Sequence, residues 1–298
     1  MALSHRPYET MHDFYELAAA HGRWLTSEQQ HLFMHPGDVA HRLSSGLRGT
    51  PPSEAVDIWF DGEALVGWSL LLGNSMTLDI TIDPDREEIF EKVLEHAASQ
   101  IQTRFPNREF SVEIAVSTAS RITTAEALGY VPLNAPYVLT SRSLTKIPTP
   151  LLPTGYRIVA STNVDINVIV EAHNGSFGSS WTADTYRKIQ EHPGRSTDLE
   201  LIALAPDGSG AGFTVVWCDE TSRIGLFEPV GTHQDHQRMG VGTALMASGL
   251  AELQRRGMRT VRVTYEAANV ASQSLYHSLG FSDVARFDDY RLVPRNAN

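Results

Sequence analysis

The sequence predicts a fold of the α/β (α+β) class, with two domains in tandem, each a central mixed, mostly antiparallel sheet flanked by helices. The chain has 298 residues, and at roughly 150 residues per domain this length favours two domains. Each half also carries the same features in the same order and reaches a Leu-Gly-aromatic sequence, Leu128-Gly129-Tyr130 and then Leu279-Gly280-Phe281. The offset between these two sequences is 151 residues. We therefore interpret the chain as a duplicated domain.

The repeated features can be assigned in chain order. Asp61-Gly62 and Asp207-Gly208 each separate two apolar runs, which is typical of a β-hairpin. Each hairpin is followed by a segment with apolar residues three and four positions apart, which predicts amphipathic helices near residues 89–101 and 246–253. Alternating apolar residues then predict strands near 110–116 and 261–265. Each half thus combines hairpins, helices and a central sheet.

A proline-rich segment separates the copies. Pro148, Pro150 and Pro153 disfavour both helix and sheet interior, so residues 146–154 are predicted to form a linker. The predicted domains are 1–145 and 155–298.

Composition excludes several classes of protein. The formal net charge of −11 argues against a nucleic-acid partner. The longest apolar runs fall short of a membrane span, and Met1–Glu28 is polar, so no membrane partner and a cytoplasmic location are expected. The single cysteine, Cys218, excludes an intrachain disulfide and is predicted to be a small buried strand residue.

A glycine-rich turn in residues 229–245 is the sharpest local signal. Gly240 and Gly242 would let the backbone approach a ligand at the start of a helix. The free amides there and the helix dipole favour an anion, most naturally a phosphate or pyrophosphate. No lysine follows the glycines as in a nucleotide P-loop, and Leu245 stands where a dinucleotide motif needs a small residue.

Together with Gln237, this turn reads Q-x-x-G-x-G and resembles motif A of the GCN5-related N-acetyltransferase (GNAT) superfamily. Residues 269–281 are similar to the next motif of that family, N-x-x-A-x-x-L-Y-x-x-L-G-F. The close resemblance covers about residues 223–281 and, more loosely, the half that begins at Gly155. It implies two tandem GNAT-like domains, a catalytic C-terminal one and a degenerate N-terminal one.

The resemblance also implies which residues bind acetyl-CoA, the expected co-substrate. Main-chain groups of Val230, Gly231 and Thr232 would contact the pantetheine arm, Asn269 would border the cofactor, and Tyr276 would lie near its sulfur. The pyrophosphate would be held at the glycine turn, formed by Gln237, Arg238, Met239, Gly240, Val241, Gly242 and Thr243.

The implied reaction is acetyl transfer to an amine by direct attack. Tyr276 is the candidate general acid, because a phenol stays protonated at neutral pH; packing as one more aromatic residue is the alternative. Glu228 is the candidate base, with an ordinary solvated or ion-paired strand residue as the alternative. His233, Asp235 and His236 are further candidate bases. As metal ligands these last three lie too close together in the chain to converge on one ion, and no metal is expected.

The acceptor is predicted to be a small-molecule primary amine. By the resemblance, the first helices of the C-terminal domain shape its site, where Phe177 and Trp181 could form a wall. The alternative function is a non-catalytic acyl-CoA-binding or regulatory module, which would need the glycine turn but neither base nor acid.

The N-terminal copy is predicted to bind no cofactor. The repeat places residues 86–92, which hold three glutamates and no glycine, opposite the glycine turn, and Ala125 opposite Tyr276. Residues 77–113 contain 9 acidic and 4 basic residues, whereas residues 223–262 contain 3 and 6. The expected role of this copy is to wall the acceptor cleft, since pockets favour domain interfaces.

Overall fold

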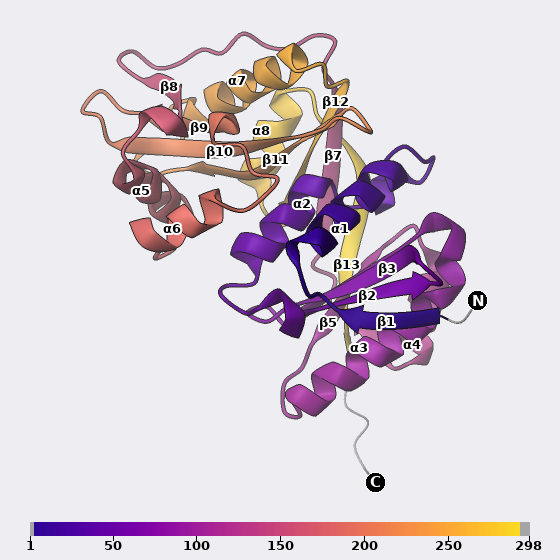
Figure 1. Cartoon of the computed structure of the whole chain (residues 1–298). Coiled ribbons are helices and arrows are strands. Elements are labelled where there is room, and N and C mark those ends of the chain that lie inside the picture. The colour runs from indigo at the N-terminus through magenta and orange to yellow at the C-terminus, as the bar shows by residue number, and fades with distance from the viewer. Residues whose placement is uncertain (1–2, 293–298) are drawn as a thin grey trace.

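The computed structural model describes residues 3–292, and all thirteen strands of that part of the chain join one sheet (Figure 1). Its order is β1-β2-β3-β4-β5-β13-β7-β12-β11-β10-β9-β8, with β6 paired to β13. The strands are β1 Leu3–Pro7, β2 Val56–Asp61, β3 Ala64–Leu72, β4 Thr77–Ile82, β5 Ser111–Ala115, β6 Tyr130–Pro132, β7 Tyr137–Ser143, β8 Arg157–Ala160, β9 Glu200–Leu204, β10 Gly210–Asp219, β11 Ile224–Thr232, β12 Thr260–Glu266 and β13 Ser282–Leu292. The mixed sheet and its helices confirm the predicted fold class.

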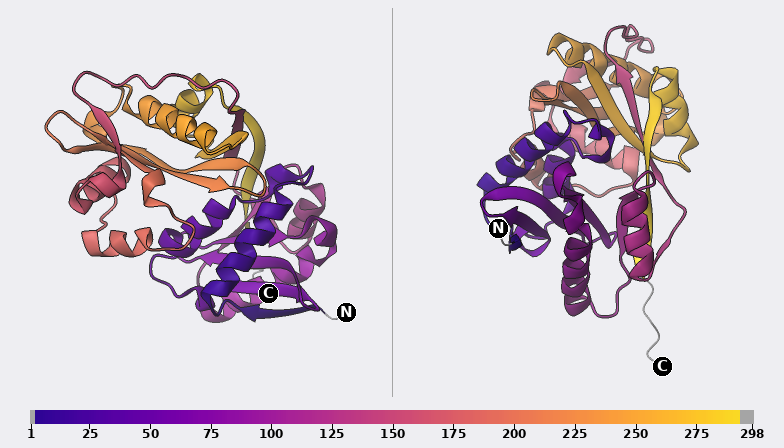
Figure 2. Two further views of the ribbon diagram at one scale, coloured as in Figure 1. Left: turned by 45° about the horizontal axis from the view of Figure 1, so that its top comes forward. Right: turned by 90° about the vertical axis from the view of Figure 1, so that its right-hand side faces the viewer.

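Helices cover both faces of this sheet (Figures 1 and 2). They are α1 Met11–Trp24, α2 Pro36–His41, α3 Phe90–Arg104, α4 Ala119–Ala127, α5 Ile166–Phe177, α6 Ala183–Gln190, α7 Val241–Arg255 and α8 Val270–Ser278. The two amphipathic helices expected near residues 89–101 and 246–253 are α3 and α7. Among residues 3–292, no helix is both long enough and apolar enough to cross a membrane.

The duplication is visible in the helix positions. Helices α3 and α7 both have 15 residues and begin at residues 90 and 241, and α4 and α8 both have 9 residues and begin at 119 and 270. Both pairs are offset by 151 residues, the same offset as between the two Leu-Gly-aromatic sequences.

The last strand of each half pairs with strands of the other half. Strand β7 lies between β12 and β13, and β13 pairs with β5, β6 and β7. The right-hand view of Figure 2 shows β13, in yellow, running from the C-terminal half into the N-terminal half. The sheet is therefore continuous across the two copies, and the linker at residues 146–154 stays a prediction. The predicted outer limits at residues 1 and 298 lie outside the described residues.

A shared hydrophobic core also joins the halves. Helices α1 and α2 lie between them (Figure 1) and contribute Phe14, Leu17 and Val39 to a cluster that includes Phe213 and Trp217 of β10. Alternate residues of β10 point to opposite faces, so Val216 packs instead in a cluster with Met246 and Leu250 of α7. Cys218 is partly buried on the same strand, and burial raises its pKa to about 11, which leaves the thiol protonated.

Two pairs of parallel strands diverge and open the centre of the molecule. Strand β11 pairs with β12 only at residues 224–226, and β4 pairs with β5 only at residues 77–78. Beyond these points the two strands of each pair separate and leave a space between them. The backbone and side chains at the separated ends line that space. One such opening belongs to each copy.

Candidate active site

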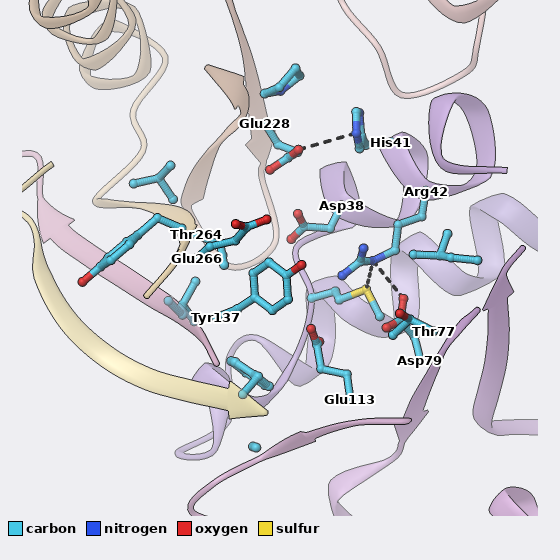
Figure 3. Close-up of a pocket in the computed structure, with 18 of the residues that line it drawn as sticks. Asp38, His41, Arg42, Thr77, Asp79, Glu113, Tyr137, Glu228, Thr264 and Glu266 are labelled. Carbon is cyan, nitrogen blue, oxygen red and sulfur yellow. Dashed lines mark hydrogen bonds and ion pairs between the residues drawn. The ribbon is translucent and has the colours of Figure 1, made fainter. Parts of the chain in front are cut away.

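A cavity of about 540 Å³ lies where the two openings meet, and both halves line it. The C-terminal half contributes the diverging ends of β11 and β12 and the start of α8. The N-terminal half contributes α2 and the diverging ends of β4 and β5. In the close-up, Glu228, Asp38 and Glu113 approach one space from three different elements (Figure 3). The expectation that the N-terminal copy walls a cleft is consistent with this arrangement.

Glu228 lies on β11 with its side chain in this cavity, 29% exposed. The Trp217 indole donates a 2.7 Å hydrogen bond to the Glu228 main-chain carbonyl oxygen, which holds the backbone in place. Burial and the nearby Asp38 carboxylate raise the pKa of Glu228 to about 7, although the Arg42 guanidinium opposes the shift. A carboxylate with this pKa can accept a proton near neutral pH.

A histidine from the N-terminal half faces Glu228. His41 Nε2 on α2 is 3.5 Å from Glu228 Oε1 (Figure 3), and the Ser45 hydroxyl is 3.0 Å from His41 Nδ1. Burial and the nearby Arg195 and Arg42 lower the pKa of His41 to about 3. The imidazole is therefore neutral at pH 7, so it does not offset the effect of Asp38 on the Glu228 carboxylate.

Tyr276 lines the cavity from α8 and is only 5% exposed. Its ring packs near those of Tyr265 and Phe281, with centroids 6.0 and 6.1 Å away. Burial and the Glu228 charge raise its pKa above the usual value. The phenol is therefore protonated across the physiological range, as a general acid requires, and it also packs in the core as the alternative interpretation expected.

The glycine turn leads into α7 as the sequence predicted. Gly240 has a φ of +86° and open space where a Cβ would stand, and Arg238 has a φ of +59°. The Ala244 amide donates to the Gly240 carbonyl at 3.0 Å, so the amides before it lie in the first helical turn, which has no preceding carbonyls. Met239 at the same turn is exposed. This arrangement suits an anion.

Close packing places the end of β11 beside this turn. A Cβ on Gly242 would come within 3.0 Å of the Thr232 hydroxyl, and a Cβ on Gly231 would meet Ser176 and Phe213. Gln237 Nε2 donates to the Thr232 carbonyl at 3.4 Å. The predicted pantetheine and pyrophosphate segments are therefore neighbours.

Asn269 and Val230 both line the cavity. Asn269 caps α8, where its side chain accepts a 3.0 Å hydrogen bond from the Ser272 amide. The cavity thus extends from the candidate acid and base toward the candidate cofactor residues.

The other candidate bases have partners elsewhere. His233 Nδ1 accepts from the Asp235 amide at 3.2 Å, and His236 Nδ1 is 2.9 Å from the Tyr156 hydroxyl. Neither these histidines nor Asp235 is among the described residues that line the cavity, so Glu228 is the better placed of the candidates.

The two aromatic residues predicted for the acceptor site differ in position. Phe177 lines the cavity and is 51% exposed. Trp181 instead packs against the shared core, with the Arg48 guanidinium 4.9 Å from its ring centroid. Only Phe177 therefore borders the cavity in the part of the chain that the structure describes.

Sequence reasoning missed the acidic groups that the N-terminal half places in the cavity. They are Asp38, Asp79 and Glu113, joined by Arg42, whose Nε lies 3.2 Å from Asp79 Oδ2 (Figure 3). Burial, reinforced by Asp79, raises the pKa of Glu113 to about 8. The available signal was a carboxylate inside an apolar strand, as in Leu78-Asp79-Ile80 and Val112-Glu113-Ile114.

In the N-terminal copy, an ion pair occupies the position that corresponds to the glycine turn. Glu87, in a short 3₁₀ helix before α3, accepts from Arg121 Nε at 2.5 Å and from Nη2 at 2.7 Å. The Arg121 guanidinium also lies 4.7 Å from the Phe90 ring centroid. An acidic side chain thus stands where the C-terminal copy offers free amides.

Comparison with known proteins finds one family model and several relatives that this chain resembles. Residues 166–281 match the acetyltransferase (GNAT) family. The chain is 37% identical over 82 residues to the [ribosomal protein bS18]-alanine N-acetyltransferase of Escherichia coli, which covers 27% of this chain and 53% of that protein. It thus aligns with about half the length of that relative. A mycothiol acetyltransferase of Pseudarthrobacter chlorophenolicus is 27% identical over 276 residues, covering 86% and 83% of the two chains.

Solved structures share the whole fold. A tandem GNAT protein from the clavulanic acid biosynthesis pathway superposes with a TM-score of 0.69 at 18% identity, covering 99% of this chain and 100% of that one. A GCN5-related N-acetyltransferase from Sphaerobacter thermophilus gives 0.67 at 19% identity, with coverage of 97% and 95%. The family match, the relatives and the tandem fold agree with one another. Residues 166–281 therefore resemble the acetyltransferase (GNAT) family, and the described chain shares the fold of tandem GNAT proteins.

Proposed function

We propose that the protein is an acyl-CoA-dependent N-acetyltransferase that moves an acetyl group from acetyl-CoA to the primary amine of a small molecule. The observation that carries this proposal is the Glu228 carboxyl group, with a pKa of about 7, in the same cavity as the protonated Tyr276. The match of residues 166–281 to the acetyltransferase (GNAT) family and the anion-binding geometry of the glycine turn support acetyl-CoA as the donor.

Each group then has one chemical task. Acetyl-CoA supplies an activated thioester, held by the turn before α7 and by β11. Glu228 removes a proton from the bound ammonium, which frees the nitrogen lone pair to attack the thioester carbonyl carbon. As the carbon–sulfur bond breaks, Tyr276 donates its proton to the departing thiolate, and the proton lost by the new amide restores the phenol through solvent.

The charge of the cavity favours a cationic acceptor. Its lining includes Asp38, Asp79, Glu113 and Glu228, while its arginines, Arg42 and Arg121, are paired with Asp79 and Glu87. Burial and a neighbouring carboxylate, Asp79 for Glu113 and Asp38 for Glu228, raise the pKa values of both glutamates. A bound ammonium would lower both pKa values, because an opposite charge favours the ionised carboxylate. The cavity volume of about 540 Å³ suits a small molecule.

The test is to incubate the protein with acetyl-CoA and a panel of amines while following free thiol release. The panel should contain mono- and diamines, amino sugars and a peptide with a free N-terminus. Thiol release with a small amine supports the proposal. Acetyl-CoA binding without thiol release from any amine would instead identify a non-catalytic module.

Gly240→Val is expected to abolish coenzyme A binding measured by calorimetry. The new side chain would enter the open space beside the turn, and a β-branched residue at a φ of +86° also strains the loop. The cost in folding stability should be about 1–2 kcal/mol. Gly257→Val, at a φ of +78° beyond the other end of α7, carries the same backbone penalty and should retain binding. Equal affinity in Gly240→Val and wild type would contradict the assignment.

Titration with coenzyme A is expected to saturate at one equivalent per chain. The N-terminal copy offers the Glu87 carboxylate, paired with Arg121, instead of free amides, so it should not attract a pyrophosphate. Glu87→Gln should leave coenzyme A binding unchanged. A second site of similar affinity that survives Gly240→Val would show that the N-terminal copy also binds the cofactor.

A further inference from the structure

Three metal-ligating side chains meet on the N-terminal half, outside the cavity. They are His5 on β1, Asp57 on β2 and His96 on α3, and one ligand atom of each lies within 4.8 Å of the other two. No other set of three or more His, Cys, Asp or Glu residues within residues 3–292 meets this criterion. The set therefore stands apart from the candidate acyl-transfer site.

The separations fit one ion. His96 Nε2 and Asp57 Oδ2 are 3.5 Å apart, and the His5 and His96 ring centroids are 4.0 Å apart. Two ligands bonded to Zn²⁺ at 2.0–2.1 Å with tetrahedral angles lie about 3.3 Å from each other. Small rotations of the side chains would thus bring the three ligand atoms to bonding distance.

The backbone holds the three groups on one face. Strand register places His5 opposite Trp59, and Asp57 is two residues from Trp59 on the same strand. The side chains of His5, Asp57 and Trp59 therefore point to the same side of the sheet. Helix α3 covers that side and brings His96. The Trp59 ring is 1% exposed and packs against both imidazoles, with centroids 4.7 and 5.3 Å away. The buried Trp59 ring therefore supports the imidazole rings of His5 and His96.

Solvent can complete the coordination. The His96 and Asp57 side chains are 21% and 26% exposed, and His5 is exposed. A water molecule could therefore take the fourth position of a tetrahedral site. Two imidazoles and one carboxylate suit a borderline-soft ion such as Zn²⁺ better than Mg²⁺, which prefers oxygen ligands.

We propose that His5, Asp57 and His96 bind a divalent transition-metal ion, with Zn²⁺ as the preferred occupant. Strand β1 is the edge strand of the sheet and pairs with β2. An ion held by all three side chains would tie β1 and β2 to α3, which gives the site a stabilising role. The sequence-based expectation of no metal considered only ligands close together in the chain, namely His233, Asp235 and His236. The ligands proposed here come from three separate elements, so that spacing argument does not apply to them.

The test uses the full chain after dialysis against EDTA, titrated by calorimetry with ZnCl₂ and, separately, with MgCl₂. We expect one tightly bound Zn²⁺ per chain, a higher thermal midpoint with Zn²⁺, and no response to Mg²⁺. His96→Gln and Asp57→Asn should each weaken Zn²⁺ binding at least about tenfold, as losses around metal sites generally do. His12→Ala is the control, because His12 is exposed on α1 and belongs to no such set.

Circular dichroism and the thermal midpoint in EDTA show whether each variant keeps its fold. The His233 and His236 side chains remain in every variant, so a selective loss in His96→Gln and Asp57→Asn assigns the ion to this set. Wild-type protein that binds no Zn²⁺ overturns the proposal. So do folded variants that bind Zn²⁺ as tightly as wild type. Neither result bears on the proposed acetyl transfer, which is measured by thiol release.

Discussion

Glu228→Gln is expected to lower kcat/KM for the best amine by about 10²–10⁴-fold, the usual contribution of a general base. Glutamine keeps the size of the side chain but cannot accept the proton of the ammonium. Acetyl-CoA affinity should change little, because the charge of Glu228 is not directed at the pyrophosphate turn. Steady-state kinetics measure the first effect, and calorimetry with coenzyme A measures the second.

The pH profile makes this prediction specific to a proton acceptor. Burial and Asp38 raise the pKa of Glu228 to about 7, so the group is protonated and inactive below that pH. For wild type, kcat/KM should rise with pH through about 7, and Glu228→Gln should lose this rise. Below pH 7 the difference between the two proteins should therefore shrink.

Glu220→Gln is the matched control, because Glu220 is an exposed glutamate in the turn between β10 and β11. It should keep wild-type activity and the wild-type pH profile. If Glu228→Gln instead retained activity within twofold, Glu228 would be an ordinary half-buried strand residue. The base would then have to be sought among the other cavity acids or in solvent.

Tyr276→Phe is expected to reduce turnover by about 10²–10⁴-fold, since it removes only the hydroxyl that protonates the thiolate. The ring stays in its contacts with Tyr265 and Phe281, so the fold and acetyl-CoA binding should be nearly unchanged. Single-turnover measurements of thiol release separate this chemical step from product release.

Tyr130→Phe provides the matched control for the loss of a buried phenol. Tyr130 is 3% exposed in the core of the N-terminal copy, and its hydroxyl has no hydrogen-bond partner among the described residues. Its activity should equal that of wild type. Turnover of Tyr276→Phe within twofold of wild type would assign Tyr276 to packing and leave protonation of the thiolate to water.

The sequence by itself determined the repeat, the amphipathic helices and the glycine turn. These features are local: α3 and α7 follow from apolar residues three and four positions apart, and the turn follows from Gly240 and Gly242 before a helix. Tyr276 could be nominated because it stands in a motif that is continuous in the chain, and Glu228 because it lies just before the predicted pantetheine segment. Their roles stay predictions until the variants are measured.

Only the tertiary structure decided how the two copies combine. The exchange of β7 and β13 depends on pairings between residues more than one hundred positions apart. No local sequence pattern specifies which other strand a given strand will pair with. The same long-range packing brings Asp38 and His41 to Glu228 and raises its pKa by desolvation and charge. It also gathers His5, Asp57 and His96 from three elements. Strand pairing, burial and electrostatic coupling depend on which residues lie close together in space, and the spacing of residues along the chain does not determine this.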